Sequence, residues 1–214
     1  MHTHAIIKTQ GGGDHLIVTI DRQYGSGGRL VGEKLAALLG YPFYDRELLK
    51  IAAQESGMHE DVVEHFDEKP VSSLLYSTYL YTTMSVTDAL PLNQKLAFAQ
   101  FDVIRKVAEK GSCVIVGRCA DYVLQDRKDC FNVFISASRP VRHERLAKYY
   151  GIPEELAEKT IRKQDKMRSE YYNFFTQRKW GEASNYHLCV DAGLFSLDGA
   201  AELIAAAVRQ LEEK

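Results

Sequence analysis

The sequence predicts an α/β protein with a five-stranded parallel sheet and helices on both of its faces. Short strand-like runs alternate with helical patterns along the chain, and several of these runs are bounded by glycine or polar turn residues. Strands that are separated by helices are expected to pair in parallel, because each connection must cross the sheet. In such sheets ligands bind at the carboxyl ends of the strands, so functional residues are expected directly after each strand.

Five short apolar runs are predicted to form the strands. They are Leu16–Asp21, Pro42–Asp45, Ser112–Gly117, Phe131–Ala137 and Tyr186–Asp191. Helical patterns fill the intervals between them. These patterns are Arg29–Leu39, Arg46–Glu55, a long set from about Glu60 to Lys110, Pro140–Tyr150, Glu154–Gln177 and Leu197–Glu213.

Two of the helical stretches exceed what a minimal α/β unit needs. We expect the first, about 56–110, to form an acceptor-side helical region, and the second, about 151–185, to form a lid. The tyrosine-rich segment Tyr76–Tyr81 would pack either an acceptor pocket or a homodimer interface, and spacing does not separate the two. Residues 1–15 are expected to be a flexible leader before a single domain over 16–214.

Composition excludes several classes of function. A net charge of -2 argues against nucleic acid as the main partner. No apolar run reaches the roughly 18 residues of a membrane span, and the first residues lack the features of a signal peptide. The cysteines have no metal-ligand spacing and are expected to be buried free thiols in a reducing cytoplasm. They are Cys113, Cys119, Cys130 and Cys189.

A glycine cluster between the first strand and the first helix indicates a phosphate-binding loop. The run LIVTID supplies the strand, and the turn is Gly25-Ser26-Gly27-Gly28. Backbone N–H groups at the start of a helix lack partners, and the helix dipole adds partial positive charge there, so phosphate is the natural ligand. A purely structural turn needs one glycine and does not account for three.

Two known loop patterns match this cluster incompletely. The dinucleotide pattern G-x-G-x-x-G has Leu30 in place of its third glycine. The Walker pattern G-x-x-x-x-G-K-[ST], anchored on Gly27, places Arg22 at the first glycine. It also places Gly28 at the lysine and Arg29 at the serine or threonine.

Segments along the whole chain resemble the cytidylate-kinase-like family, a branch of the P-loop nucleoside monophosphate kinases with a G-S-G-G-R or G-S-G-G-K loop. The first is TIDRQYGSGGRLVGEKLAALLGYPFYDRELL. In order after it follow CVIVGRCADYVL, NVFISASRPVRHERL, IRKQDKMRSEYYNFFTQRKW and YHLCVDAGLFSLDGAAELI. The resemblance covers about residues 16–210 and implies a P-loop NTPase fold that uses ATP and Mg²⁺.

The resemblance implies that the loop holds the phosphates of ATP. The residues expected to bind this cofactor are Tyr24, Gly25, Ser26, Gly27, Gly28, Arg29 and Leu30. Arg29 lies one residue past the usual lysine and is expected to supply the missing charge, because a guanidinium offers a bidentate fork to phosphate oxygens. In place of the absent Ser/Thr hydroxyl, Ser26 is the predicted magnesium ligand.

The acceptor is expected to bind where two further strands end. Cytidylate kinases carry G-R-D after the third strand, and this chain has GRCAD, so Arg118 is expected to contact the acceptor phosphate. Cys119 replaces the aspartate of that motif, and Asp121 is the nearest candidate substitute. After the second strand, Asp45 and Arg46 are further predicted acceptor ligands. N-capping of the next helix is the alternative interpretation of Asp45.

The segment 139–179 carries eleven Lys and Arg against six Asp and Glu. Within it, Arg162, Asp165 and Arg168 recur every third residue, which indicates one helical face. Asp165 and Arg168 also match the lid motif R-D-x-x-D-x-x-R of cytidylate kinases. The resemblance implies that these arginines close on the transferring phosphate, with Asp165 holding them or a ribose hydroxyl. Lid closure would exclude water.

We therefore predict ATP-dependent phosphoryl transfer to a small phosphorylated acceptor, a nucleoside monophosphate such as CMP or dCMP. The predicted catalytic residues are Arg29, Arg118, Arg162, Asp165 and Arg168. A nucleotide-binding regulator on the same fold is the alternative, motivated by the missing Walker lysine and by Cys119. A dinucleotide enzyme is disfavoured by Leu30 and by the absence of a second nucleotide-binding half.

Overall fold

The computed structural model describes residues 15–45, 47–55 and 92–213, and every structural statement below refers to these residues. The predicted leader, Arg46, the tyrosine-rich segment Tyr76–Tyr81 and most of the predicted acceptor-side region lie outside them.

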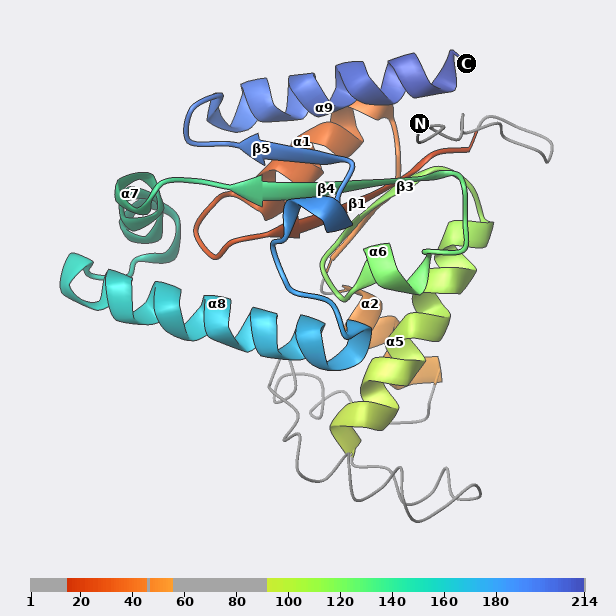
Figure 1. The fold of residues 1–214 in the computed structure, drawn as a ribbon, viewed down its shortest axis with the longest axis horizontal. Helices are drawn as coiled ribbons and strands as arrows, with labels where there is room; N and C mark the ends of the chain where they lie inside the picture. The colour runs from red at the N-terminus through yellow and green to blue at the C-terminus, as the bar shows by residue number, and fades with distance from the viewer. Residues whose placement is uncertain (1–14, 46, 56–91, 214) are drawn as a thin grey trace, which may run out of the picture.

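Five strands form one parallel sheet in the order β2-β3-β1-β4-β5 (Figure 1). Their bounds are β1 Ile17–Arg22, β2 Phe43–Tyr44, β3 Cys113–Val116, β4 Cys130–Ser136 and β5 Leu188–Asp191. The predicted fold class is confirmed, and each strand lies within about two residues of its predicted bounds.

Strand β1 occupies the centre of the sheet and is buried along its whole length. Ile17 is in register with Cys113 on one side and with Cys130 on the other. Its side chain belongs to the core cluster on one face of the sheet, whereas Val18 and Ile20 belong to the cluster on the opposite face. This alternation is the period of two expected for a strand with helices packed on both sides.

Helices cover both faces of the sheet (Figure 1). On one face lie α1 Gly28–Leu39 and α9 Ser196–Glu212. On the other lie α2 Glu47–Glu55, α5 Leu92–Glu109, α6 Ala120–Val123 and part of α8 Glu154–Thr176. Helix α7 Arg139–Tyr150 follows the carboxyl end of β4, and a short 3-10 helix, Ala183–Asn185, precedes β5. The sequence did not predict α6 or the 3-10 helix.

Helix α1 packs closely on the sheet and thereby fixes where its first turn lies. Its buried face includes Val31 and Leu35. A Cβ at Gly32 would lie 2.9 Å from Val116 Cγ2, so a larger residue there would push the helix away. The helix ends at Gly40, which has φ +68° and donates its N–H to the carbonyl of Ala36.

The four cysteines were expected to be buried free thiols, and three of them are buried. All four cysteines are free thiols, and burial raises the pKa of Cys113 and Cys130 to about 12. Cys119 is buried as well, but Cys189 is exposed because it lies on the edge strand β5. Among the helices of the described residues, none is long and apolar enough to cross a membrane.

Candidate functional site

A cavity of about 540 Å³ opens where β1, β2 and β3 end and α1 begins. The glycine turn after β1 forms part of its wall, together with aromatic and polar side chains from α7 and α8. Four arginines line it, which are Arg22, Arg29, Arg118 and Arg168. The only acidic side chain among the described lining residues is Asp45, so the cavity favours an anionic ligand.

The glycine turn has a shape that only glycine adopts easily. Gly25 and Gly27 have φ of +76° and +85°. A Cβ at Gly25 would lie 2.5 Å from Leu146 Cδ1, and one at Gly27 would lie 2.3 Å from Leu197 Cδ2. Gly27 caps α1, whose N-terminal N–H groups are therefore presented at the cavity, as the loop interpretation predicts.

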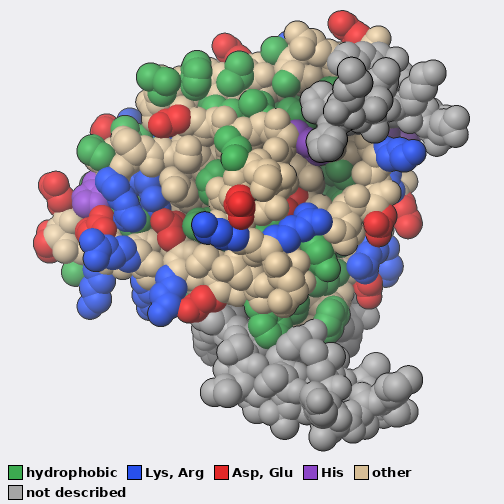
Figure 2. Space-filling model, in the orientation of Figure 1, with side chains coloured by type: hydrophobic (Ala, Val, Ile, Leu, Met, Phe, Trp, Pro, Cys, Tyr) green, Lys and Arg blue, Asp and Glu red, His purple; other side chains and the backbone are tan. Residues whose placement is uncertain are grey.

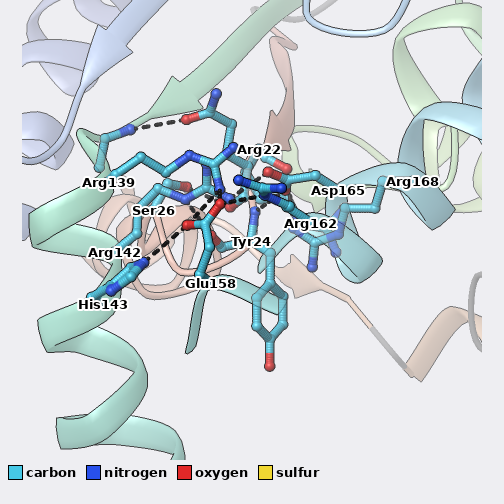
Figure 3. A network of polar contacts seen from close by, with 12 residues as sticks. Arg22, Tyr24, Ser26, Arg139, Arg142, His143, Glu158, Arg162, Asp165 and Arg168 are labelled. Carbon is cyan, nitrogen blue, oxygen red and sulfur yellow. Dashed lines mark hydrogen bonds and ion pairs between the residues drawn. The ribbon is translucent and has the colours of Figure 1, made fainter. Parts of the chain in front are cut away.

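Three arginines hold the backbone of this turn through its carbonyl groups, and two of them, Arg142 and Arg168, are labelled in Figure 3. Arg142 Nε donates to the carbonyl of Tyr24 at 2.6 Å. The carbonyls of two further loop residues accept in the same way. Arg145 Nη1 donates to the carbonyl of Ser26. Arg168 Nη1 donates to the carbonyl of Arg22 at 3.0 Å. Burial lowers the pKa of the Arg145 guanidinium.

Asp165 completes this frame from α8. Its Oδ1 accepts the N–H of Tyr24 at 2.8 Å, and its Oδ2 accepts from Arg142 Nη2. Arg142 is 2% exposed, so a buried ion pair joins α7, α8 and the loop. The predicted lid helix is thus in contact with the loop through Asp165 and Arg168. Figure 2 shows basic side chains gathered at the end of the molecule where α7 and α8 lie.

Arg29 and Asp45, both predicted site residues, meet at the rim of the cavity. Arg29 Nε donates to Asp45 Oδ2 at 2.8 Å, and its Nη1 lies 3.4 Å from Glu33 Oε2. The guanidinium also lies over the ring of Phe43, 5.9 Å from its centroid. Its side chain is 52% exposed, so this charge lies at the mouth of the cavity.

Arg118 reaches the cavity from an unusual turn. Gly117, Arg118 and Cys119 follow β3 with φ of +77°, +61° and +54°, three left-handed residues in succession. Each non-glycine residue in this region costs about 1–3 kcal/mol, and such strain clusters at ligand-binding sites. Arg118 is 4% exposed and lines the cavity. Its contact with an acceptor phosphate stays a prediction.

Asp121 lies away from the cavity. It is 4% exposed, and its Oδ2 accepts a hydrogen bond from the hydroxyl of Tyr172 at 2.7 Å. Burial, with a smaller contribution from the nearby charge of Asp21, raises the pKa of Asp121 to about 6. The carboxyl group borders a separate hollow that also contains Arg178. The structure therefore does not bring Asp121 together with Arg118 in the cavity.

Arg162 also lies apart from the other predicted catalytic residues. Its Nε donates to Glu158 Oε1 at 2.5 Å, and its side chain is 75% exposed on the outer surface of α8. Glu158 additionally contacts Arg139 and His143 of α7. Arg162 thus belongs to a surface charge network between the two helices, and it is absent from the lining of the cavity.

Comparisons with known proteins agree with this geometry. The family model described as the cytidylate kinase-like family matches residues 17–193. The chain belongs to the cytidylate kinase-like family. A solved structure of an uncharacterized protein from Eubacterium ventriosum has 31% identity and a TM-score of 0.68, covering 91% of this chain and 98% of that one. No curated protein matches the chain.

Two more distant structures support the fold alone. Shikimate kinase from Bacteroides thetaiotaomicron has 13% identity and a TM-score of 0.51, covering 93% of this chain and 99% of its own. TT1252 from Thermus thermophilus has 14% identity and a TM-score of 0.51, covering 92% and 98%. The chain therefore has the P-loop kinase fold that the sequence predicted.

The residues present fit the phosphates of the ATP used by P-loop kinases better than they fit its magnesium ion. The glycine turn and four arginines suit an anion. Ser26, however, is fully buried, and its hydroxyl donates to the carbonyl of Gln23 at 2.8 Å. It does not line the cavity. No group of three His, Cys, Asp or Glu side chains suited to a metal occurs in the described part of this kinase-like chain.

Several residues that line the cavity of this family member belong to none of the predicted site motifs. Arg22 departs from the Walker pattern, and the signal that identifies it is its place at the carboxyl end of β1, where ligands bind in parallel sheets. Tyr149, Tyr150 and Gln164 also line the cavity, and no motif in the sequence marks them. The ring of Tyr150 lies 5.6 Å from that of Tyr24, a contact that no spacing in the sequence predicts.

Proposed function

We propose that the protein transfers the terminal phosphoryl group of ATP to a small phosphorylated acceptor, a nucleoside monophosphate of the CMP or dCMP type. The observation that carries this proposal is the cavity in which the glycine turn at the start of α1 meets four arginines. A phosphoryl group in transfer carries charge on several oxygens, so catalysis depends on positioned positive charge and needs no nucleophilic side chain.

On the donor side, the backbone N–H groups of Gly25–Gly28 would bind the phosphates of ATP. The turn is already held by Arg142, Arg145 and Asp165, so it does not have to be ordered when ATP binds. When bound with ATP, Mg²⁺ would neutralise part of the phosphate charge.

On the acceptor side, Arg118 would bind the acceptor phosphate. It lies at the end of β3 and is nearly buried, so its charge acts where water screens little. Asp45, oriented by Arg29, is the carboxylate best placed to contact a hydroxyl of the acceptor. Arg46 is a further proposed acceptor ligand from the sequence.

Helix α8 would cover the reacting groups. Arg168 and Gln164 line the cavity from this helix, and the guanidinium of Arg168 lies over the ring of Tyr24 at 5.4 Å from its centroid. A cover of this kind keeps water from the transferring group and so suppresses the hydrolysis of ATP.

A coupled assay that follows ADP formation tests the proposal. ATP is combined in turn with CMP, dCMP, UMP and AMP, first with the wild-type chain and then with Arg118→Ala. Arg105→Ala is the matched control, since Arg105 is an exposed arginine of α5 that pairs with Asp102. We expect turnover with at least one monophosphate, loss of it in Arg118→Ala, and wild-type turnover in the control.

A nucleotide-binding regulator is the second candidate function. It is favoured by the buried hydroxyl of Ser26 and by Arg29 at the serine or threonine position of the Walker pattern, which leave the loop without an exposed hydroxyl ligand for magnesium. The same assay, together with calorimetric titration of the chain with ATP, separates the two candidates. Binding of ATP without turnover of any acceptor would reject the kinase proposal and support the regulator.

A further inference from the structure

Two positions of the loop have exchanged small and cationic residues relative to the Walker pattern. Arg22 stands where that pattern has its first glycine, and Gly28 stands where it has its lysine. We propose that Arg22, from the end of β1, supplies the phosphate-binding charge that the loop lacks at position 28. The inference rests on the proposed function, because it assigns a residue to the same phosphate site.

The two positions are in direct contact in space. A Cβ atom at Gly28 would lie 2.4 Å from Arg22 Cβ and 2.8 Å from Arg22 Cγ, which is closer than real atoms approach. On its other side this Cβ would lie 3.3 Å from Ile135 Cβ, a tight but smaller conflict. The stem of Arg22 therefore fills the space where the side chain of a lysine at position 28 would begin. One of the two residues has to be glycine.

The guanidinium of Arg22 lies beside the cavity and against Gly117, the residue that precedes Arg118. A Cβ at Gly117 would lie 2.2 Å from Arg22 Nη1 and 3.0 Å from Arg22 Cζ, so the guanidinium rests directly on this glycine. The side chain is 11% exposed and yet lines the cavity. Its Nη1 lies 3.8 Å from Asp21 Oδ1, which places a carboxylate beside the guanidinium.

The remaining cavity arginines lie elsewhere. Arg29 is at the rim, half exposed and bonded to Asp45. Arg168 arrives from α8 and donates to the carbonyl of Arg22. Arg118 follows β3, on the acceptor side. Of the four, Arg22 is the one whose stem a Cβ at Gly28, the first residue of α1, would meet. A nearly buried guanidinium there would bind phosphate oxygens more strongly than an exposed one, because water screens it less.

The exchange is tested by reversing it. Arg22→Gly, Gly28→Lys and the double variant Arg22→Gly/Gly28→Lys are compared with the wild-type chain by calorimetric titration with inorganic tripolyphosphate and with ATP. Thermal denaturation of each variant reports folding. Arg22→Met removes the charge but keeps the volume against Gly28 and Gly117, so it separates charge from packing. Arg105→Ala is again the control for loss of a surface arginine.

We expect Arg22→Met and Arg22→Gly to bind both probes about 10- to 100-fold more weakly, the usual range for one lost charge-assisted hydrogen bond. Gly28→Lys alone is expected to lower the melting temperature, because its stem collides with Arg22. The double variant is expected to recover both the melting temperature and the binding.

Two results would overturn the inference. One is a folded Arg22→Met variant that binds both probes as tightly as the wild-type chain. The other is a double variant whose losses are the sum of the two single losses, since neighbours that exchange roles must be non-additive. Failure of the proposed function looks different. If the four proteins bind the probes as expected but none turns over any acceptor, the kinase proposal is rejected and Arg22 remains the phosphate ligand. Absence of binding to the wild-type chain rejects both.

Discussion

Two pairs of arginines around the loop differ in where their side chains lie. Arg142 and Arg145, from α7, donate to backbone carbonyls of the loop. Arg22 and Arg118, from the ends of β1 and β3, line the cavity. Arg22, Arg118 and Arg142 are buried and Arg145 is partly buried, so burial alone does not separate the two pairs. Their positions do: the first pair holds the backbone of the loop, and the second pair lines the cavity, where we propose that it provides charge for a ligand.

This difference explains how a loop without a lysine keeps its form. Carbonyl groups of consecutive loop residues repel one another unless donors hold them, and α7 provides those donors from outside the cavity. A loop prepared in this way loses less conformational freedom when an anion binds. The predictions that follow test whether the two groups are separable, from the largest expected effect to the smallest.

The largest effect is expected from Arg142→Ala. The substitution removes the donor to Tyr24 and leaves the carboxylate of Asp165 without its buried partner. Breaking a buried ion pair by removing one member costs about 3–5 kcal/mol. Urea denaturation measures this loss. Arg139→Ala, on the same helix but half exposed, is the control and should cost no more than about 1 kcal/mol. Equal losses in the two variants would show that Arg142 does not frame the loop.

Arg118 should affect turnover much more than stability. We expect Arg118→Ala and Arg118→Gly to lower kcat about 10²- to 10³-fold in the acceptor assay, as removal of a positioned charge does. Because residue 118 has φ +61°, the glycine variant should be about 1 kcal/mol more stable than the alanine variant. Denaturation of the two variants measures that difference. Turnover retained in both would remove Arg118 from the site.

Asp121 was a predicted acceptor ligand but lies outside the cavity, and its raised pKa can be tested through the pH dependence of stability. Its pKa in the folded chain, about 6, is above its ordinary value of 3.8. Between about pH 4 and pH 6 the folded state keeps a proton that the unfolded state has lost, so stability falls as pH rises through this window. The cost at neutral pH is up to about 3 kcal/mol.

Asp121→Asn cannot ionise and should escape this cost. Its unfolding free energy relative to the wild-type chain is expected to rise between pH 4 and pH 7, as followed by urea denaturation at several pH values. A difference between the two proteins that stays constant with pH would contradict the raised pKa. Large loss of turnover in the folded variant would instead return Asp121 to the acceptor site.

The smallest effect is expected from Arg162→Ala. Its ion pair with Glu158 joins residues one turn apart on α8, and Arg162 is 75% exposed, so stability should change by no more than about 1 kcal/mol. Since Arg162 lies outside the cavity, we expect turnover to change by less than about tenfold. A loss as large as that of Arg118→Ala would mean that α8 moves to bring Arg162 to the ligand during the reaction.

The sequence predicted the parts of the site that depend on local pattern. The glycine cluster predicted the turn, because left-handed backbone at Gly25 and Gly27 requires that residue type. The sequence did not reveal which arginines reach the cavity. Residues three apart on a helix are turned by about 60° from one another, so Arg162 and Arg168 differ by about 120° around α8. One reaches the loop, and the other faces solvent.

By itself, the sequence determined the parallel α/β fold, the family and the position of the phosphate loop, since these follow from periodicity, glycine placement and motif order. Tertiary structure decided the roles of the charged residues. The left-handed turn after β3 directs Arg118 to the cavity and Asp121 away from it. The contact between Arg22 and Gly28 joins the end of β1 to the start of α1. Such contacts depend on how elements pack in space, and spacing along the chain does not contain that information.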